Sequence, residues 1–149
     1  MIAPSPKIID RPEDRQTALI ISPAAEDHEV FGEFFQRHGW VLEHANSVHS
    51  GWGLLDAKTP SLVITEANLG VGNWKDVLEA MQSLTNPPLV IVFSRLADEH
   101  LWAEALNLGA YDVLAKPFDQ TELGQVLRSA WTHCQKRPRA LALAVGSAS

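Results

Sequence analysis

The sequence predicts a doubly wound α/β domain built on a five-stranded parallel sheet. Short apolar runs of strand length alternate five times with segments whose apolar residues recur at helical spacing. The most apolar runs, TALIIS at 17–22 and LVIVFS at 89–94, are typical of strands covered by helices on both faces. Strict strand–helix alternation favours a parallel sheet, because parallel neighbours need a crossover connection.

Length and composition indicate which classes of protein this chain can belong to. The chain has 149 residues, of which 46% are hydrophobic, and a formal net charge of −6, which is typical of one globular domain. An acidic chain gains nothing from counterion release, so we expect no nucleic-acid partner. No apolar stretch approaches the roughly 20 residues that span a bilayer, and the N-terminus lacks a signal-peptide core. With Cys134 as its single cysteine, the chain is expected to be cytoplasmic, with no membrane association.

The first two strand–helix units lie before residue 60. The strand at 17–22 is followed by a helix over 27–38, whose apolar residues have helical spacing and which ends at Gly39. The segment at 40–45 alternates apolar and polar residues like a short strand. Ser47 is expected to cap the second helix, which Thr59-Pro60 ends.

The remaining three units follow the same order. Strands are predicted at 61–66, 89–94 and 111–115, and helices at 74–84, 98–108 and 119–134. The predicted domain therefore covers 17–134. Residues 1–16 are interpreted as a flexible leader and 135–149 as a flexible tail.

The carboxyl ends of the strands carry most of the polar residues that could do chemistry. In an open parallel sheet these ends and the loops after them form the functional edge. The residues expected at this edge are Ser22 and Pro23 after the first strand, Glu66 after the third, Ser94 and Arg95 after the fourth, and Lys116 after the fifth.

Three segments, LVITEANLG, VIVFSR and AYDVLAKPFD, resemble the receiver domain of bacterial two-component response regulators. The resemblance extends from about Thr17 to Cys134 and implies flavodoxin-like topology with strand order 2-1-3-4-5. In that family an Asp at the end of the third strand accepts a phosphoryl group from a histidine kinase, and two acids after the first strand help to hold Mg²⁺. A Ser or Thr and a Lys, matched here by Ser94 and Lys116, contact the phosphoryl group.

The sequence departs from the family pattern at the site itself. Glu66 stands in place of the phosphoacceptor Asp, and Ser22-Pro23 replaces the acidic pair. Val113 occupies the position of the family's switch aromatic, and Tyr111, two residues earlier, is expected to point the same way. Glu26 and Asp27 are expected in the first turn of the first helix, serving its dipole and capping, so the metal site is expected to be lost.

These departures predict a degenerate receiver with no catalytic residue, metal or cofactor. Glu66 is expected to form an ion pair with Lys116 and to be near Ser94, with Arg95 as a second cation or a lid over the site. A contact to a loop amide is the competing interpretation of Ser94, and a solvated loop side chain is that of Arg95. The predicted function is phosphorylation-independent protein–protein interaction in signal transduction. Two alternatives stay open: phosphorylation at Glu66 or another acceptor, and a small α/β enzyme or nucleotide-binding protein, although SPAAED lacks a Gly-rich phosphate loop.

Two tryptophans are candidate contact residues for a partner protein. Trp102 and Trp131 fall on the fourth and fifth predicted helices, which receivers commonly use with the fifth strand to dimerise or bind partners. Helix–sheet packing is the competing interpretation of both side chains. The expected partner is a signalling protein or histidine kinase, or a second copy of the chain. The histidines lack zinc-type spacing with cysteine and are interpreted as surface or cap residues: His28, His38, His44, His49, His100 and His133.

Overall fold

Strands and helices alternate along residues 17–136, the part of the chain that the computed structural model describes. Every boundary lies within two residues of its predicted position. The predicted leader, and the predicted tail beyond residue 136, lie outside the described residues. The elements are β1 (Thr17–Ile21), α2 (Ala25–Arg37), β2 (Val41–Ala45), α3 (Val48–Lys58), β3 (Leu62–Glu66), α4 (Trp74–Gln82), β4 (Leu89–Ser94), α5 (Glu99–Leu108), β5 (Asp112–Ala115) and α6 (Gln120–Lys136).

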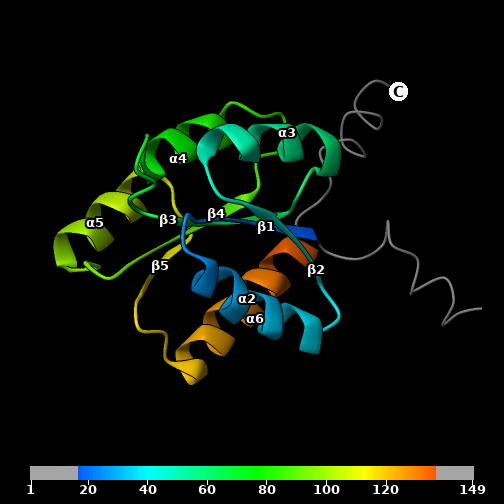
Figure 1. The fold of residues 1–149 in the computed structure, drawn as a ribbon, viewed down its shortest axis with the longest axis vertical. Helices are drawn as coiled ribbons and strands as arrows, with labels where there is room; N and C mark the ends of the chain where they lie inside the picture. The colour runs from blue at the N-terminus through cyan, green and yellow to red at the C-terminus, as the bar shows by residue number, and fades with distance from the viewer. Residues whose placement is uncertain (1–16, 137–149) are drawn as a thin grey trace, which may run out of the picture.

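The five strands form one parallel sheet in the order β2-β1-β3-β4-β5, which confirms the predicted topology. Helices α2 and α6 cover one face of this sheet, and α3 and α4 cover the other (Figure 1). The register aligns the strand ends, since Glu66 of β3 is opposite Phe93 of β4, and Ser94 is opposite Ala115 of β5. The carboxyl ends of the central strands therefore meet at one edge.

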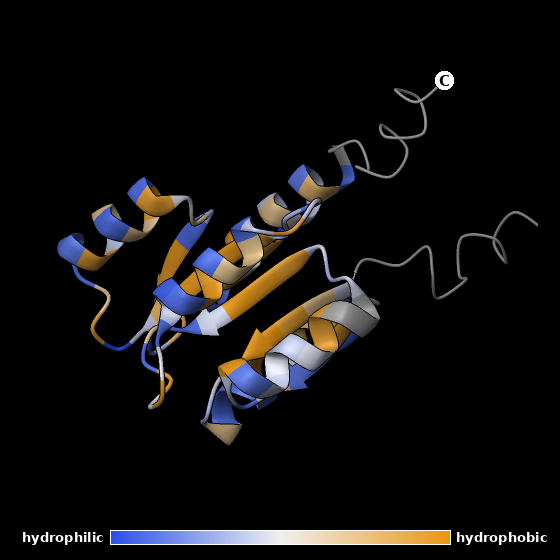
Figure 2. Ribbon diagram, turned by 90° about the horizontal axis from the view of Figure 1, so that it is seen from above, coloured by the Kyte–Doolittle hydropathy of each residue, from blue (hydrophilic) through white to orange (hydrophobic). Residues whose placement is uncertain are grey.

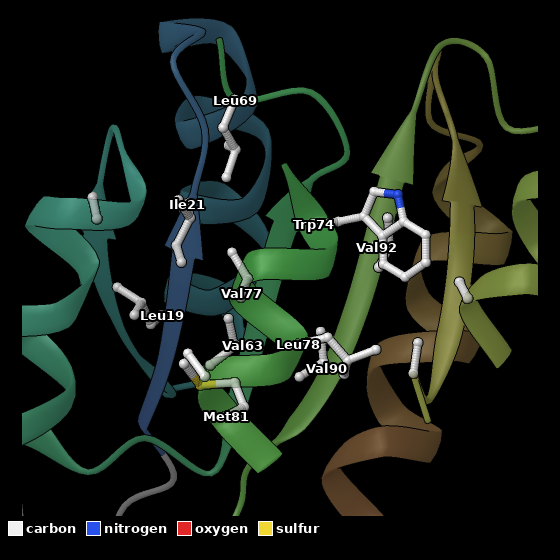
Figure 3. Packing of buried hydrophobic residues seen from close by; sticks show 14 of the residues in the cluster. Leu19, Ile21, Val63, Leu69, Trp74, Val77, Leu78, Met81, Val90 and Val92 are labelled. Atoms are coloured by element: carbon white, nitrogen blue, oxygen red, sulfur yellow. The ribbon is translucent and has the colours of Figure 1, made fainter. Parts of the chain in front are cut away.

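Each face of the sheet has its own hydrophobic core. The strands are hydrophobic along most of their length, whereas the helices are hydrophobic mainly on the side that packs against them (Figure 2). The core under α2 and α6 contains phenylalanines of α2 packed against β3, β4 and β5. The core on the other face is made largely of α4 side chains over the central strands (Figure 3), among them Trp74, Val77, Leu78 and Met81 over Leu19, Val63, Val90 and Val92.

Local signals end the elements as the sequence predicts. The Ser47 hydroxyl accepts a hydrogen bond from the backbone N–H of Ser50 and so caps α3. Gly109 ends α5 with a φ of 113°, a conformation that favours glycine. Within residues 17–136, no helix is both long and apolar enough to cross a membrane.

The half-buried ring of Trp131 packs against another tryptophan of the domain. It is stacked on the ring of Trp40, with the centroids 4.5 Å apart and an angle of 9° between the planes. Trp40 in turn contacts Phe34 and Phe35 of α2. For Trp131 the structure therefore favours helix packing over the interface role that we had considered.

We expect Phe31→Ala to lower the free energy of unfolding by about 3–5 kcal/mol. Phe31 is fully buried and its ring contacts both Phe93 and Phe118, so truncation leaves a cavity under α2. Urea unfolding followed by circular dichroism measures the change. Val71→Ala is the control, because Val71 is 91% exposed and its truncation should change stability by less than about 0.5 kcal/mol. Equal effects of the two substitutions would contradict the packing described.

Candidate functional site

The ammonium group of Lys116 lies at the centre of the candidate site. Lys116 directly follows β5, its peptide bond to Pro117 is cis, and its backbone N–H donates to the carbonyl oxygen of Ser94 at 3.0 Å. The Nζ atom lies 2.8 Å from Oε1 of Glu66 and 3.0 Å from Oδ2 of Asp27. We call Lys116, Glu66 and Asp27 the ion-paired cluster. It joins the ends of β3 and β5 to the first turn of α2.

Glu66 is held at both carboxylate oxygens. Oε1 accepts from Lys116, while Oε2 accepts from the backbone N–H groups of Ala67 at 2.8 Å and Asn68 at 3.3 Å. The side chain therefore turns back over the start of its own loop while still reaching the lysine. The predicted ion pair between Glu66 and Lys116 is present.

Asp27 has a different role from the predicted one in the dipole and capping of α2. It lies in the first turn of α2, as predicted, but its side chain is only 2% exposed and points into the site. The Ser22 hydroxyl donates to Oδ2 at 2.7 Å, and Lys116 binds both carboxylate oxygens. A signal was available, because residue 27 shares the buried stripe of α2 with Phe31 and Phe34, where an acid needs a partner.

Burial and charge act in opposite directions on Lys116, whose side chain is 12% exposed. Burial by itself lowers the pKa of the ammonium group, but the hydrogen bonds and charges of Glu66 and Asp27 outweigh burial. The pKa of Lys116 therefore lies above its usual value of 10.5. The lysine stays charged at physiological pH.

Ser94 and Arg95 do not join the cluster. The Ser94 hydroxyl is buried and accepts a hydrogen bond from the backbone N–H of Leu96 at 3.0 Å, so it satisfies a loop amide. The Arg95 side chain is exposed and forms no ion pair with any described residue. Of the two interpretations of Arg95, the structure therefore favours the solvated loop side chain over a second cation for Glu66.

Val113 and Tyr111 lie on opposite faces of the sheet. Val113 packs in the core under α4, whereas Tyr111 packs on the α6 side, where its hydroxyl lies 2.7 Å from the hydroxyl of Ser129. The prediction that both point the same way is wrong. Tyr111 precedes the first residue of β5, so the alternation of the strand does not extend to it.

Pro23 and Trp102 are both exposed at the surface. Pro23 follows Ser22 in the loop before α2 and offers no side-chain ligand for a cation. Trp102 lies on α5 with 50% of its surface exposed. Of the two tryptophans considered as contact residues, Trp102 is therefore the more exposed.

Comparison with known proteins identifies the family. The sequence model of the response regulator receiver domain family matches residues 19–128, and the chain belongs to this family. RegA, the photosynthetic apparatus regulatory protein of Cereibacter sphaeroides, is 29% identical over 118 residues, which cover 76% of this chain and 61% of RegA. ActR, the acid tolerance regulatory protein of Sinorhizobium medicae, is 30% identical over 88 residues, which cover 59% of this chain and 45% of ActR.

Solved structures show the same fold. The signal receiver domain of an HD domain-containing protein from Pseudomonas fluorescens superposes with a TM-score of 0.75 at 24% identity, covering 83% of this chain and 99% of that domain. The matched part of the curated relatives is thus less than two thirds of their length. The resemblance concerns the receiver domain, and the activities of the full-length relatives are not transferred.

We expect Lys116→Met to destabilise the fold by about 3 kcal/mol or more, because it leaves Asp27 and Glu66 without their cation. The free energy of unfolding in urea gives the measurement. Lys75→Met is the matched control: the Lys75–Glu104 pair is half exposed, with side-chain exposures of 50% and 33%, so its loss should cost less than about 1 kcal/mol. Equal losses for both variants would show that the cluster contributes no more than a surface pair.

The raised pKa of Lys116 predicts a loss of stability at alkaline pH. Below the unfolded-state pKa of about 10.5 the lysine is charged in both states, so its contribution is fully present. As the pH rises through the higher folded-state pKa, that contribution is lost. Urea unfolding from about pH 10 to about pH 12 should therefore show a steeper decline for the natural chain and Lys75→Met than for Lys116→Met. An equal decline in all three proteins would refute this assignment.

Proposed function

We propose that this chain is a receiver domain held in one signalling state by its ion-paired cluster, and that it acts through protein–protein contacts without being phosphorylated. The observation that carries the proposal is the pairing of Lys116 with Glu66 at 2.8 Å and with Asp27 at 3.0 Å. In the family pattern, this lysine contacts a phosphoryl group that is added and removed reversibly. Here the chain's own carboxylates bind the lysine permanently.

The state of Glu66 supports this proposal. An acceptor carboxylate must offer a free oxygen to the incoming phosphorus atom, in line with the leaving group. Oε1 of Glu66 is bound by Lys116, and Oε2 is bound by two backbone N–H groups. Attack would require at least one of these contacts to break.

The side chains that follow β1 also support the proposal, because they offer few oxygen ligands for Mg²⁺. Mg²⁺ prefers carboxylate, phosphate and water oxygens in octahedral geometry. Ser22 directs its hydroxyl hydrogen to Asp27, and Pro23 has no side-chain oxygen. Both oxygens of Asp27 accept from Lys116, so this carboxylate is already neutralised by a cation. The residues present do not fit the magnesium site of the family.

The switch residues are also replaced or engaged. Val113 is 8% exposed and packs in the core on the α4 face of the sheet. Because Val113 is aliphatic, it has no aromatic ring that could rotate between two positions. The Ser94 hydroxyl is hydrogen-bonded to the loop that follows it. These contacts favour a single arrangement of β4, β5 and their loops.

Signalling proteins such as kinases or phosphotransfer proteins are the proposed partners. A receiver of this fold, that of Ssk1 from Saccharomyces cerevisiae, has been crystallised with the histidine phosphotransfer protein Ypd1, and it superposes with a TM-score of 0.66 at 15% identity. On this chain, the exposed Trp102 offers an aromatic anchor on α5. A homodimer through α5, β5 and α6 is the alternative use of this surface.

Incubation with acetyl phosphate and Mg²⁺ tests the proposal, with intact mass measured at neutral pH immediately afterwards. We expect no phosphorylated species, because the acceptor oxygens are occupied and the metal ligands are replaced. A receiver that carries the family's Asp and acidic pair, treated in parallel, shows that the reagents are active.

A phosphorylated species of the natural chain would overturn the proposal. The Glu66→Gln variant then separates the two remaining possibilities. If that species disappears in Glu66→Gln, Glu66 is the acceptor; if it persists, the acceptor is another residue.

A further inference from the structure

Two histidines meet beside the functional edge, away from the ion-paired cluster. His28 lies in the first turns of α2, and His44 is the penultimate residue of β2, the edge strand of the sheet. Since Leu42 packs in the core under α2, side-chain alternation places His44 on the same face. The two Nδ1 atoms are 2.8 Å apart, and the ring centroids are 5.0 Å apart.

A backbone carbonyl fixes the tautomer of His28. Its Nε2 atom lies 2.8 Å from the carbonyl oxygen of Ser22, which can only accept a hydrogen bond. Nε2 therefore carries the hydrogen, and Nδ1 of the neutral ring presents its lone pair to His44. A histidine that binds a metal typically donates its second ring N–H to a carbonyl or carboxylate in this way.

We propose that His28 and His44 form a binding site for a late first-row divalent cation such as Zn²⁺, with each ring binding through Nδ1. Imidazole nitrogen suits Zn²⁺, Ni²⁺ and Cu²⁺. Ligand distances of about 2.0–2.1 Å at a tetrahedral angle separate two nitrogens by roughly 3.3 Å, so the two Nδ1 atoms need to move apart by about 0.5 Å and both rings need to turn toward the ion. On binding, His44 adopts the tautomer that carries its hydrogen on Nε2.

The surroundings support a weak, solvent-open site. Burial, and then the neighbouring His28, lower the pKa of His44 against the opposing charge of Glu43, which favours the neutral ring. Within residues 17–136, no three His, Cys, Asp or Glu side chains gather as a metal site. Water therefore supplies the remaining ligands, and the affinity is lower than that of a four-ligand structural site.

Ser22 connects this site to the ion-paired cluster. Its carbonyl oxygen is bound to His28, while its hydroxyl donates to Asp27. A cation bound to the histidine pair is thus connected through Ser22 to Asp27 of the cluster. Ser22 occupies the position of one of the two acids that help to hold Mg²⁺ in the family. The inference rests on different residues from the proposed function and can fail independently of it.

Isothermal titration of the full, untagged chain with Zn²⁺ tests the site. We expect one ion per chain, and a loss of affinity of more than about tenfold in both His28→Gln and His44→Gln, since each removes one of two protein ligands. His100→Gln is the matched control, an exposed histidine on α5, and should bind like the natural chain. Absence of saturable binding, or undiminished binding by either variant of the pair, would overturn the inference.

NMR of the natural chain gives a second readout that does not depend on the folding of the variants. Zn²⁺ should shift the imidazole signals of His28 and His44 first, together with the backbone amide signal of Ser22. A first shift at Cys134 or at another histidine would place the ion elsewhere and refute the proposed site.

Discussion

The ammonium group of Lys116 holds together three segments that are distant in the sequence: the end of β5, the end of β3 and the first turn of α2. A cation that is 12% exposed is costly to bury unless carboxylates compensate for it. Asp27 and Glu66 provide that compensation at 3.0 and 2.8 Å. Their positions at the site therefore follow from one requirement, the neutralisation of a single buried charge.

This requirement also explains why a Glu can stand at the end of β3. The longer side chain lets one oxygen reach Lys116 while the other accepts from the backbone N–H groups of Ala67 and Asn68. Asp27 replaces the missing acids after β1 in a different way, because it comes from the buried face of α2. Lys116 thus pairs with two acids, and this pairing leaves neither carboxylate free to bind another cation.

Most of the fold follows from local patterns. Continuous apolar runs, capping residues such as Ser47 and stops such as Gly109 placed every boundary within two residues. The site was predicted less completely. Glu66 and Lys116 were identified because strand ends converge at one edge, whereas the sequence left two interpretations open for Arg95, a second cation and a solvated loop side chain. The direction of a side chain in a loop depends on the turn around it, which the spacing of residues does not specify.

The sequence by itself determined the alternation of strands and helices and the placing of Glu66 and Lys116 at one edge of the sheet, because periodicity and parallel connectivity are properties of the chain's own pattern. The strand order followed from the resemblance to the receiver family. Only the tertiary structure decided which other groups complete the site. Asp27 joins the cluster, Tyr111 turns toward α6, and His28 meets His44 across 16 residues of sequence. Each of these contacts depends on how a helix is rotated against the sheet, and that rotation is set by packing of the whole core.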